Sequence, residues 1–204
     1  MIHKETVLNK TEIERTVKEM ISKKRKIKTE IHELVIKRQH TYAIAYKSFV
    51  DLSLFSLNTR RELVKRFLLK IFKDSSIKTI DGIEVSMSER SASKVSRLTF
   101  NNQQEIALYS DNLIQIAKYI NKEKSHKEKI GIFRYYDSYI FIENILFKAE
   151  LNIFIDANGS RLYDINKISQ VDARSYEGYG SSEIKNILED SKQKVNLVKT
   201  DTNN

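Results

Sequence analysis

Three side chains that can do chemistry with phosphate lie close together in the segment "RLYDINKI", residues 161–168. Arg161, Tyr163 and Lys167 occupy alternate positions there. Because alternate residues of a β-strand point to one side of a sheet, we expect these three to share a face with Ile165. Cationic groups can stabilise charge that develops on a reacting phosphate, and a tyrosine ring can stack on a planar ligand. We therefore predict a catalytic surface here, with an ordinary half-exposed sheet face as the alternative.

Further candidates of the same chemistry lie elsewhere in the second half of the chain. Arg134 is followed directly by two tyrosines, and Lys94 and Arg97 follow a serine-rich stretch. His126 has a side chain whose ordinary pKa suits general acid or base catalysis. We predict that Arg134 and His126 join the catalytic surface and that Lys94 and Arg97 bind phosphate. His126 is flanked by lysines, so an exposed loop residue without a catalytic role is the alternative.

Basic residues are concentrated in the first third of the chain. The net charge is +9, yet residues 1–73 hold 18 Lys and Arg against 8 Asp and Glu, while residues 74–204 hold 18 against 19. Such asymmetry indicates an anionic partner, most simply a nucleic acid, or an acidic protein surface. A solvated lysine-rich helix is the plain alternative. The predicted nucleic-acid-binding residues are Lys23, Lys24, Arg25, Lys26, Lys28, Arg60, Arg61, Lys94 and Arg97.

Composition argues against several other classes of protein. There is no cysteine, and the four histidines show no metal-ligand spacing, so we expect neither a metal nor another cofactor. No apolar run reaches the roughly 18 residues that a membrane span needs, and the first residues do not resemble a signal peptide. We therefore expect a cytoplasmic protein with no membrane partner.

The basic first third is predicted to be helical. Thr11 and Glu14 form the pattern of a capping box, and apolar residues recur every three or four positions after them. A similar pattern begins near Asn58. We therefore predict helices over residues 11–50 and 59–72, which pack on each other or form a homodimer with a second copy.

After residue 73 the apolar period shortens to about two, which is typical of strands. The dipeptides Asp81-Gly82 and Asn158-Gly159 predict tight hairpin turns. A helix is predicted over residues 101–122. The predicted strands cover residues 77–80, 83–87, 95–100, 130–136, 139–147, 150–156 and 161–168.

These elements predict an α+β fold in which basic N-terminal helices precede a small antiparallel sheet with one packed helix. The predicted domains are a basic helical region at 1–73, an α+β domain at 74–175 and a flexible tail at 176–204.

Four segments of the second half resemble a known group of domains. They are "GIEVSMSERSASK", "NLIQIAKYINKE", "YYDSYIFIENILFKAELNIFID" and "RLYDINKI", which together span about residues 77–170. They resemble the phage and mobile-element nuclease domains grouped with barnase, EndoU, colicin E5/D and RelE, as found near the C-terminus of large polyvalent phage proteins. The resemblance implies a barnase/RelE-like sheet beside a helix and metal-independent RNA cleavage in the cytoplasm of a host cell.

The sequence departs from that group at one chemically important point. Many of those domains carry a histidine in the region that corresponds to residues 88–97, whereas this chain has Lys94 and Arg97 there. RNA cleavage without a metal needs a base, an acid and a charge-stabilising cation. Three functions are therefore expected: a nuclease-like protein that binds or cleaves RNA, a non-enzymatic inhibitor of a host enzyme such as a defence nuclease, or a nucleic-acid-binding module that uses the N-terminal helices.

Overall fold

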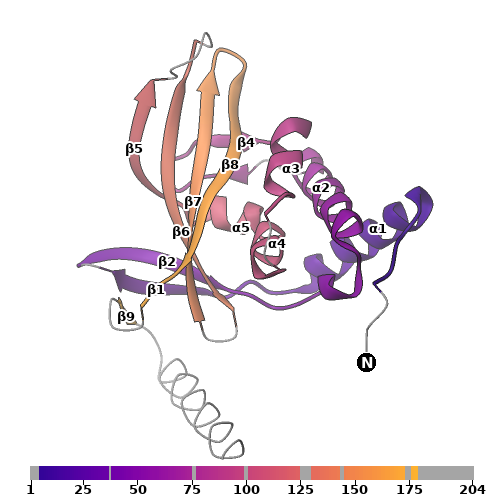
Figure 1. The fold of residues 1–204 in the computed structure, drawn as a ribbon. Coiled ribbons are helices and arrows are strands. Elements are labelled where there is room, and N and C mark those ends of the chain that lie inside the picture. The colour runs from indigo at the N-terminus through magenta and orange to yellow at the C-terminus, as the bar shows by residue number, and fades with distance from the viewer. Residues whose placement is uncertain are drawn as a thin grey trace, which may run out of the picture.

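One mixed β-sheet organises the chain in the computed structural model, and the helices pack against one of its faces (Figure 1). The structure describes residues 5–36, 38–74, 77–98, 101–124, 130–142, 145–172 and 176–178. In this part of the chain nine strands join the sheet in the order β3-β4-β8-β7-β6-β2-β1-β9, and β5 also pairs with β6. Their bounds are β1 Ile31–Ile36, β2 Gln39–Ala45, β3 Ile77–Lys78, β4 Glu84–Ser86, β5 Lys118–Lys124, β6 Ile132–Ile142, β7 Ile145–Asp156, β8 Gly159–Gln170 and β9 Tyr176–Gly178.

Five α-helices and one short 3-10 helix form the other layer of the described chain. They are α1 Lys10–Lys26, η1 Leu52–Leu54, α2 Leu57–Asp74, α3 Glu89–Val95, α4 Asn101–Ala107 and α5 Ser110–Gln115. The capping box of α1 is formed by Asn9 and Glu12, two residues earlier than the predicted pair. As Figure 1 shows, α4 and α5 lie between the sheet and the α1–α2 pair.

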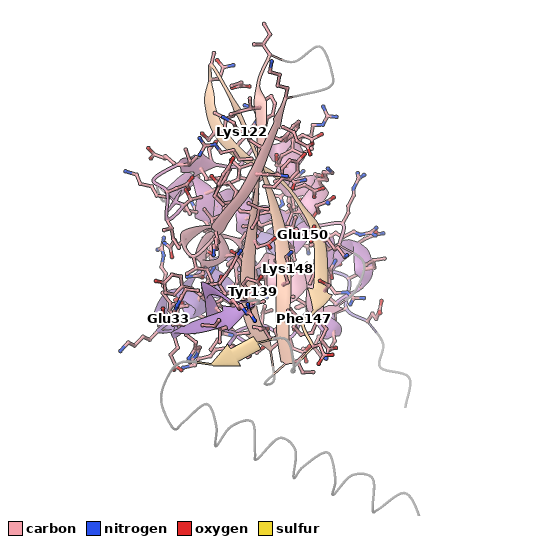
Figure 2. All side chains as sticks on the ribbon, turned by 90° about the vertical axis from the view of Figure 1, so that its left-hand side faces the viewer. Glu33, Lys122, Tyr139, Phe147, Lys148 and Glu150 are labelled. Carbon is pink, nitrogen blue, oxygen red and sulfur yellow. The ribbon has the colours of Figure 1, made fainter. Side chains whose placement is uncertain are left out.

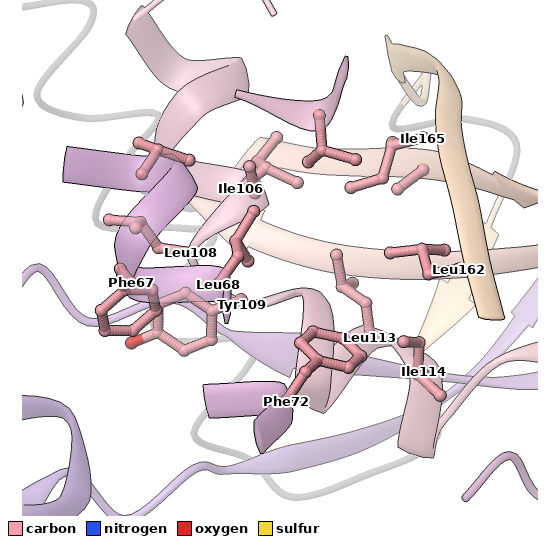
Figure 3. Packing of buried hydrophobic residues seen from close by; sticks show 14 of the residues in the cluster. Phe67, Leu68, Phe72, Ile106, Leu108, Tyr109, Leu113, Ile114, Leu162 and Ile165 are labelled. Carbon is pink, nitrogen blue, oxygen red and sulfur yellow. The ribbon is translucent and has the colours of Figure 1, made fainter. Parts of the chain in front are cut away.

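The hydrophobic core lies between the sheet and these helices. Phe67 and Leu68 from α2 meet Leu113 from α5, and Leu162 and Ile165 from β8 line the opposite wall (Figure 3). All five side chains are almost completely buried. Buried residues of α1 belong to the same cluster, so the apolar stripe of α1 is covered by the rest of its own chain. This confirms that the two N-terminal helices pack on each other, and the homodimer stays a prediction.

The predicted helix over residues 11–50 is wrong after Lys26. The chain turns at Arg38, whose φ is 64°, and β1 and β2 form an antiparallel hairpin. β2 then pairs in parallel with β6, which places Ala43 beside Tyr139 and Ile44 beside Ile140. This segment is rich in β-branched and aromatic residues, which favour strands once a sheet neighbour is present. The neighbouring strand, β6, lies nearly 100 residues later in the sequence. The spacing of apolar residues within residues 31–45 therefore gives no sign of it.

Three predictions in the second half also need correction. Residues 95–98 do not form a strand, because Val95 ends α3 and the next three residues are irregular. The helix predicted over 101–122 is broken into α4 and α5, and residues 118–122 are instead part of β5. Residues 132–142 form one continuous strand where the sequence predicted a break after residue 136. The two polar residues at that point have partners: Asp137 pairs with Lys148, and the Ser138 hydroxyl donates to the Leu113 carbonyl.

The predicted fold class is therefore wrong. Two strands come from the region predicted to be helical, the sheet has nine strands in the described chain, and two of its pairings, β2–β6 and β4–β8, are parallel. A small antiparallel barnase/RelE-like sheet with one packed helix does not describe this architecture. The sheet and the core both run across residue 73, where a domain boundary was predicted. Of the predicted tail, only β9 is described, and it pairs with β1.

The hairpin predicted around Asn158-Gly159 is confirmed. β7 and β8 pair antiparallel, with Asp156 opposite Gly159. The Asp156 carboxylate accepts from the Asn158 backbone N–H at 2.9 Å and from the Arg161 guanidinium at 2.6 Å. Gly159 has a φ of 107°, a conformation that side chains other than glycine rarely adopt.

Gly159→Ala is therefore expected to lower the free energy of unfolding by about 1–2 kcal/mol through backbone strain. No atom within 4 Å would contact the added Cβ, so steric contact adds nothing to the loss. Asn158→Ala is the matched control in the same turn, because its φ is not positive, and it is expected to change stability by under about 0.5 kcal/mol. Chemical denaturation measures both, and equal stabilities of the two variants would contradict the prediction.

Candidate functional site

A pocket of about 510 Å³ lies between α3 and β8. Four cationic side chains, three serines and one tyrosine line it: Arg90, Lys94, Arg97, Arg161, Ser88, Ser91, Ser93 and Tyr163. We term it the cationic pocket. Lys94, Arg97, Arg161 and Tyr163 were all predicted from the sequence, as parts of two separate sets. The fold brings these two sets together.

One wall of the cationic pocket is α3. Its N-cap is Ser88, whose hydroxyl accepts from the Ser91 backbone N–H at 3.1 Å. Ala92 and Val95 are fully buried and fix the helix against the core. On a helix, residues separated by three or four positions are neighbours. Arg90 and Lys94 have that spacing on α3, and Arg97 follows in the turn after the helix. All three are exposed and line the pocket.

The opposite wall is the first part of β8. The Arg161 guanidinium lies over the Phe154 ring, 4.9 Å from its centroid, while Asp156 binds it from the hairpin turn. β4 pairs in parallel with β8 and places Ser86 beside Arg161. The chain leaves β4 and enters α3 within three residues, so α3 begins next to Arg161. This short connection positions the two walls relative to each other.

Lys94 joins the two walls. Its ammonium nitrogen lies 2.6 Å from a carboxylate oxygen of Asp164 and 4.4 Å from the centroid of the Tyr163 ring. The other contact of that ring is with Phe133, edge to face, at 5.1 Å between centroids. Tyr163 is therefore held between a cation and an aromatic side chain, which fixes its orientation beside the pocket.

The charges of the cationic pocket are only half compensated. Asp156 neutralises Arg161 and Asp164 neutralises Lys94. Among the described residues, no carboxylate forms an ion pair with Arg90 or Arg97. The hydroxyls of Ser88 and Ser91 bond to each other at 2.9 Å in the cap of α3. In the described part of the chain, the guanidinium groups of Arg90 and Arg97 can therefore donate hydrogen bonds to anionic oxygens of a ligand. The pocket is chemically suited to a phosphate or another multivalent anion.

Lys167 shares a face of the sheet with Arg161, as the sequence predicted, but it does not line the pocket, and Ile165 does not lie on that face. The register of β7 and β8 shifts twice, between Ile153 and Asn152 and again between Leu151 and Glu150. Each shift inserts an extra residue in β8, which changes the face that the following residues occupy. The first shift therefore places Ile165 in the core together with Leu162. The second shift restores the alternation, so Lys167, opposite Glu150, lies on the same face as Arg161, opposite Phe154, but farther along β8 and outside the pocket.

Arg134 lies on the other face of the sheet from Arg161. The Arg134 guanidinium is 3.0 Å from the Asp81 carboxylate and lies over the Tyr119 ring. Asp81 also accepts from the Tyr136 hydroxyl at 3.1 Å. Hydrogen bonding to Tyr136 is the main cause that raises the pKa of Arg134, so this guanidinium is held in a structural network. The predicted convergence of Arg134 with Arg161 does not occur, and His126 lies outside the described residues.

Lys24 has a buried structural position, although it was predicted to bind nucleic acid. Its side chain is 8% exposed, and its ammonium group donates to the Leu108 carbonyl at 2.7 Å and pairs with Asp111. The rings of Tyr109 and Phe67 lie on either side. Burial is the main cause that lowers the pKa of Lys24, opposed by the charge of Asp111. Lys24 thus holds α1 against α5 and is unavailable to a ligand.

The remaining predicted binding residues lie outside the cationic pocket. Arg60 is within 3.8 Å of Glu5 and is mostly buried, and Arg61 is half-buried on the same helix. Four others are exposed in or just after the last turn of α1: Lys23, Arg25, Lys26 and Lys28. A nucleic-acid role for these four stays a prediction.

Arg90 and the three serines are pocket residues that were not singled out from the sequence. The signal was present in the helical spacing of positions 90 and 94, with another arginine three residues later. It was hidden because residues 95–100 were assigned to a strand, which separates Arg97 from the other two.

Within the described residues, no group of three His, Cys, Asp or Glu side chains could hold a metal ion. In the same part of the chain, no helix is long and apolar enough to cross a membrane. No protein-family model, curated protein or solved structure gives a significant match to this chain. The nuclease-like resemblance therefore stays a prediction, and the function has to be argued from the cationic pocket itself.

Proposed function

We propose that the protein binds RNA by holding backbone phosphates in the cationic pocket. The observation that carries this proposal is the convergence of Arg90, Lys94, Arg97 and Arg161 on one pocket with serine hydroxyls between them. Phosphate contacts from Arg, Lys and Ser side chains supply most of the affinity of nucleic-acid-binding proteins. The ion pairs of Arg161 and Lys94 orient their donors before a ligand arrives, which lowers the entropic cost of binding.

Binding is better supported than cleavage. RNA cleavage without a metal needs a proton acceptor and a proton donor beside the phosphate. The residues that line the described pocket are Arg, Lys, Ser and Tyr, and the nearest carboxylates, Asp156 and Asp164, are engaged by Arg161 and Lys94. Groups with ordinary pKa values near neutrality do not line it. The pocket thus supplies the charge-stabilising part of a ribonuclease site without its acid and base.

The test is fluorescence anisotropy of a labelled single-stranded RNA of about 12 nucleotides, titrated at several salt concentrations. Each phosphate contact releases counterions, and the two arginines without a carboxylate partner in the described chain predict that log K falls with log salt with a slope of about −1.4. We expect measurable binding at low salt and this dependence. A protein that does not bind RNA even at low salt would refute the proposal.

Two further measurements distinguish RNA binding from attraction to an acidic protein and from RNA cleavage. Poly-glutamate of the same length measures attraction to an acidic protein surface, and tighter binding of poly-glutamate than of RNA would contradict the proposal. RNA incubated with the protein and a chelator is expected to stay full length on a denaturing gel. Discrete fragments whose formation is lost in Arg161→Ala would instead establish that the pocket cleaves RNA.

A further inference from the structure

The open face of the sheet beside the cationic pocket holds a group of aromatic rings. The register places Phe133 of β6 opposite Phe154 of β7, and Tyr135 opposite Asn152. These residues alternate with the core-facing Arg134, Tyr136 and Ile153, so their side chains point away from the helices. In Figure 1 the helices lie on the other face of these strands.

Phe133 packs on the rings of Phe154 and Tyr163. Phe133 lies 4.9 Å from Phe154 and 5.1 Å from Tyr163, measured between ring centroids. Phe154 is only 2% exposed because its neighbours and the Arg161 guanidinium cover it. Phe133, Tyr135 and Tyr163 each keep partial exposure. We term these three residues the aromatic surface.

The aromatic surface is continuous with the cationic pocket. Tyr163 belongs to both, and Arg161 lies against Phe154, directly below the aromatic surface. A chain of nucleotides has the same two chemistries side by side, because each phosphate is joined through a sugar to a planar base. A strand whose phosphate occupies the pocket can therefore place the adjacent base over Phe133.

The lower half of the same face has a different character. Lys148 lies between Asp137, at 2.8 Å, and Glu150, at 3.3 Å. Figure 2 shows Lys148 and Glu150 on the strands that face the viewer, well below Lys122. Lys167 lies opposite Glu150 and Lys118 opposite Asp137, so the charges of this half are paired with one another. The aromatic rings lie on the upper half, at Tyr163, Phe133 and Tyr135, and this half is where bases can stack.

We propose that the aromatic surface makes the protein selective for single-stranded RNA, with bases stacked on Phe133 and Tyr135. This inference rests on the proposed function, because the cationic pocket supplies the phosphate anchor. In a duplex the base faces are stacked on each other and cannot meet a protein ring, whereas an unpaired base can. Every base has a flat face, so the selectivity concerns strandedness and only weakly the sequence.

The experiment compares Phe133→Leu and Tyr135→Ala with wild type, using three probes. Leucine retains apolar cover over Phe154, and Tyr135 has its hydroxyl bound only by the exposed Glu123 among the contacts described, so both variants are expected to fold. Loss of one stacked base should weaken single-stranded RNA binding about 10-fold per ring. Inorganic polyphosphate, which has no bases, should bind all three proteins equally. Duplex RNA of equal length should bind wild type at least about 10-fold more weakly than the single strand.

Tyr42→Ala is the matched control, since Tyr42 is an exposed tyrosine on β2, outside the aromatic surface. It is expected to leave the binding of single-stranded RNA unchanged. If both aromatic variants bind single-stranded RNA as wild type does while polyphosphate still binds, the stacking proposal is overturned and the phosphate pocket stands. Equal affinity for duplex and single strand also overturns it. Wild type that binds neither RNA nor polyphosphate overturns both proposals.

Discussion

Lys24→Met is expected to lower the free energy of unfolding by about 3 kcal/mol, whereas Lys23→Met should change it by under about 0.5 kcal/mol. Methionine keeps the aliphatic packing between Phe67 and Tyr109 but removes the cation that pairs with Asp111. The side chain of Asp111 is 19% exposed, so its charge would remain largely desolvated without a partner. The Leu108 carbonyl would also lose its donor. Urea denaturation of the three proteins measures the difference.

A double-mutant cycle separates this ion pair from packing. If the cost of Lys24→Met comes from the unpaired Asp111, adding Asp111→Asn should restore part of the loss, because a neutral amide is cheaper to bury than a carboxylate. Lys23 is the adjacent exposed residue on α1, so its substitution controls for the change in net charge and helix propensity. A Lys24→Met protein as stable as Lys23→Met would show that the buried pair contributes nothing.

Local patterns in the sequence were sufficient where neighbouring residues determine the structure. The turn between β7 and β8 was predictable because Asn158-Gly159 separates two alternating segments and Gly159 needs a positive φ. The amphipathic period was equally informative for α2, where Leu63, Val64, Phe67 and Leu68 all face the core. In both elements the determining interactions lie within one or two turns of the chain.

The features that could not be predicted depend on strands that pair although they are far apart in the sequence. Residues 31–45 have an apolar spacing that suits a helix, yet β2 is held by parallel pairing with β6. The first register shift in β8 moves Ile165 to the core face, which no alternation rule anticipates. The cationic pocket depends on such a pairing, because β4 beside β8 sets where α3 begins. Its residue types were visible in the sequence, while their assembly followed from the sheet.

The position of Lys24 also depends on residues far away in the sequence. It lies within the densest basic segment of the sequence, residues 23–28, and by composition nothing separates it from Lys23 or Lys26. Its burial follows from the helix period, which directs positions 13, 17, 20 and 24 toward α2 and α5. A charged residue on the apolar stripe of a helix therefore indicates a buried partner, here Asp111, rather than a ligand-binding surface.

Reversing the charge of Arg90 and Arg97, which form no ion pair with any described residue, is expected to weaken RNA binding in Arg90→Glu with Arg97→Glu by at least about 100-fold at low salt. Each charge-assisted hydrogen bond to phosphate contributes about 1.5–3 kcal/mol, and two are lost. The new carboxylates also repel the phosphate and compete for Lys94. Both side chains are exposed, so the fold should tolerate the change. Fluorescence anisotropy with the same labelled single strand measures the loss, and the slope of log K against log salt should become shallower.

Lys23→Glu with Lys26→Glu is the matched control, since it changes the net charge by the same amount on exposed residues of α1. If RNA responds only to overall charge, the two double variants should weaken binding equally, and the cationic pocket would have no special role. If the α1 variant binds RNA more weakly than the Arg90 and Arg97 variant, the basic end of α1 is the binding surface, as the sequence alone would suggest. A loss confined to the Arg90 and Arg97 variant requires a local contact, because long-range attraction between exposed charges is screened within about 8 Å at physiological salt. We expect this third result, since these two arginines face a pocket with fixed hydrogen-bond donors, whereas the basic residues of α1 do not line that pocket.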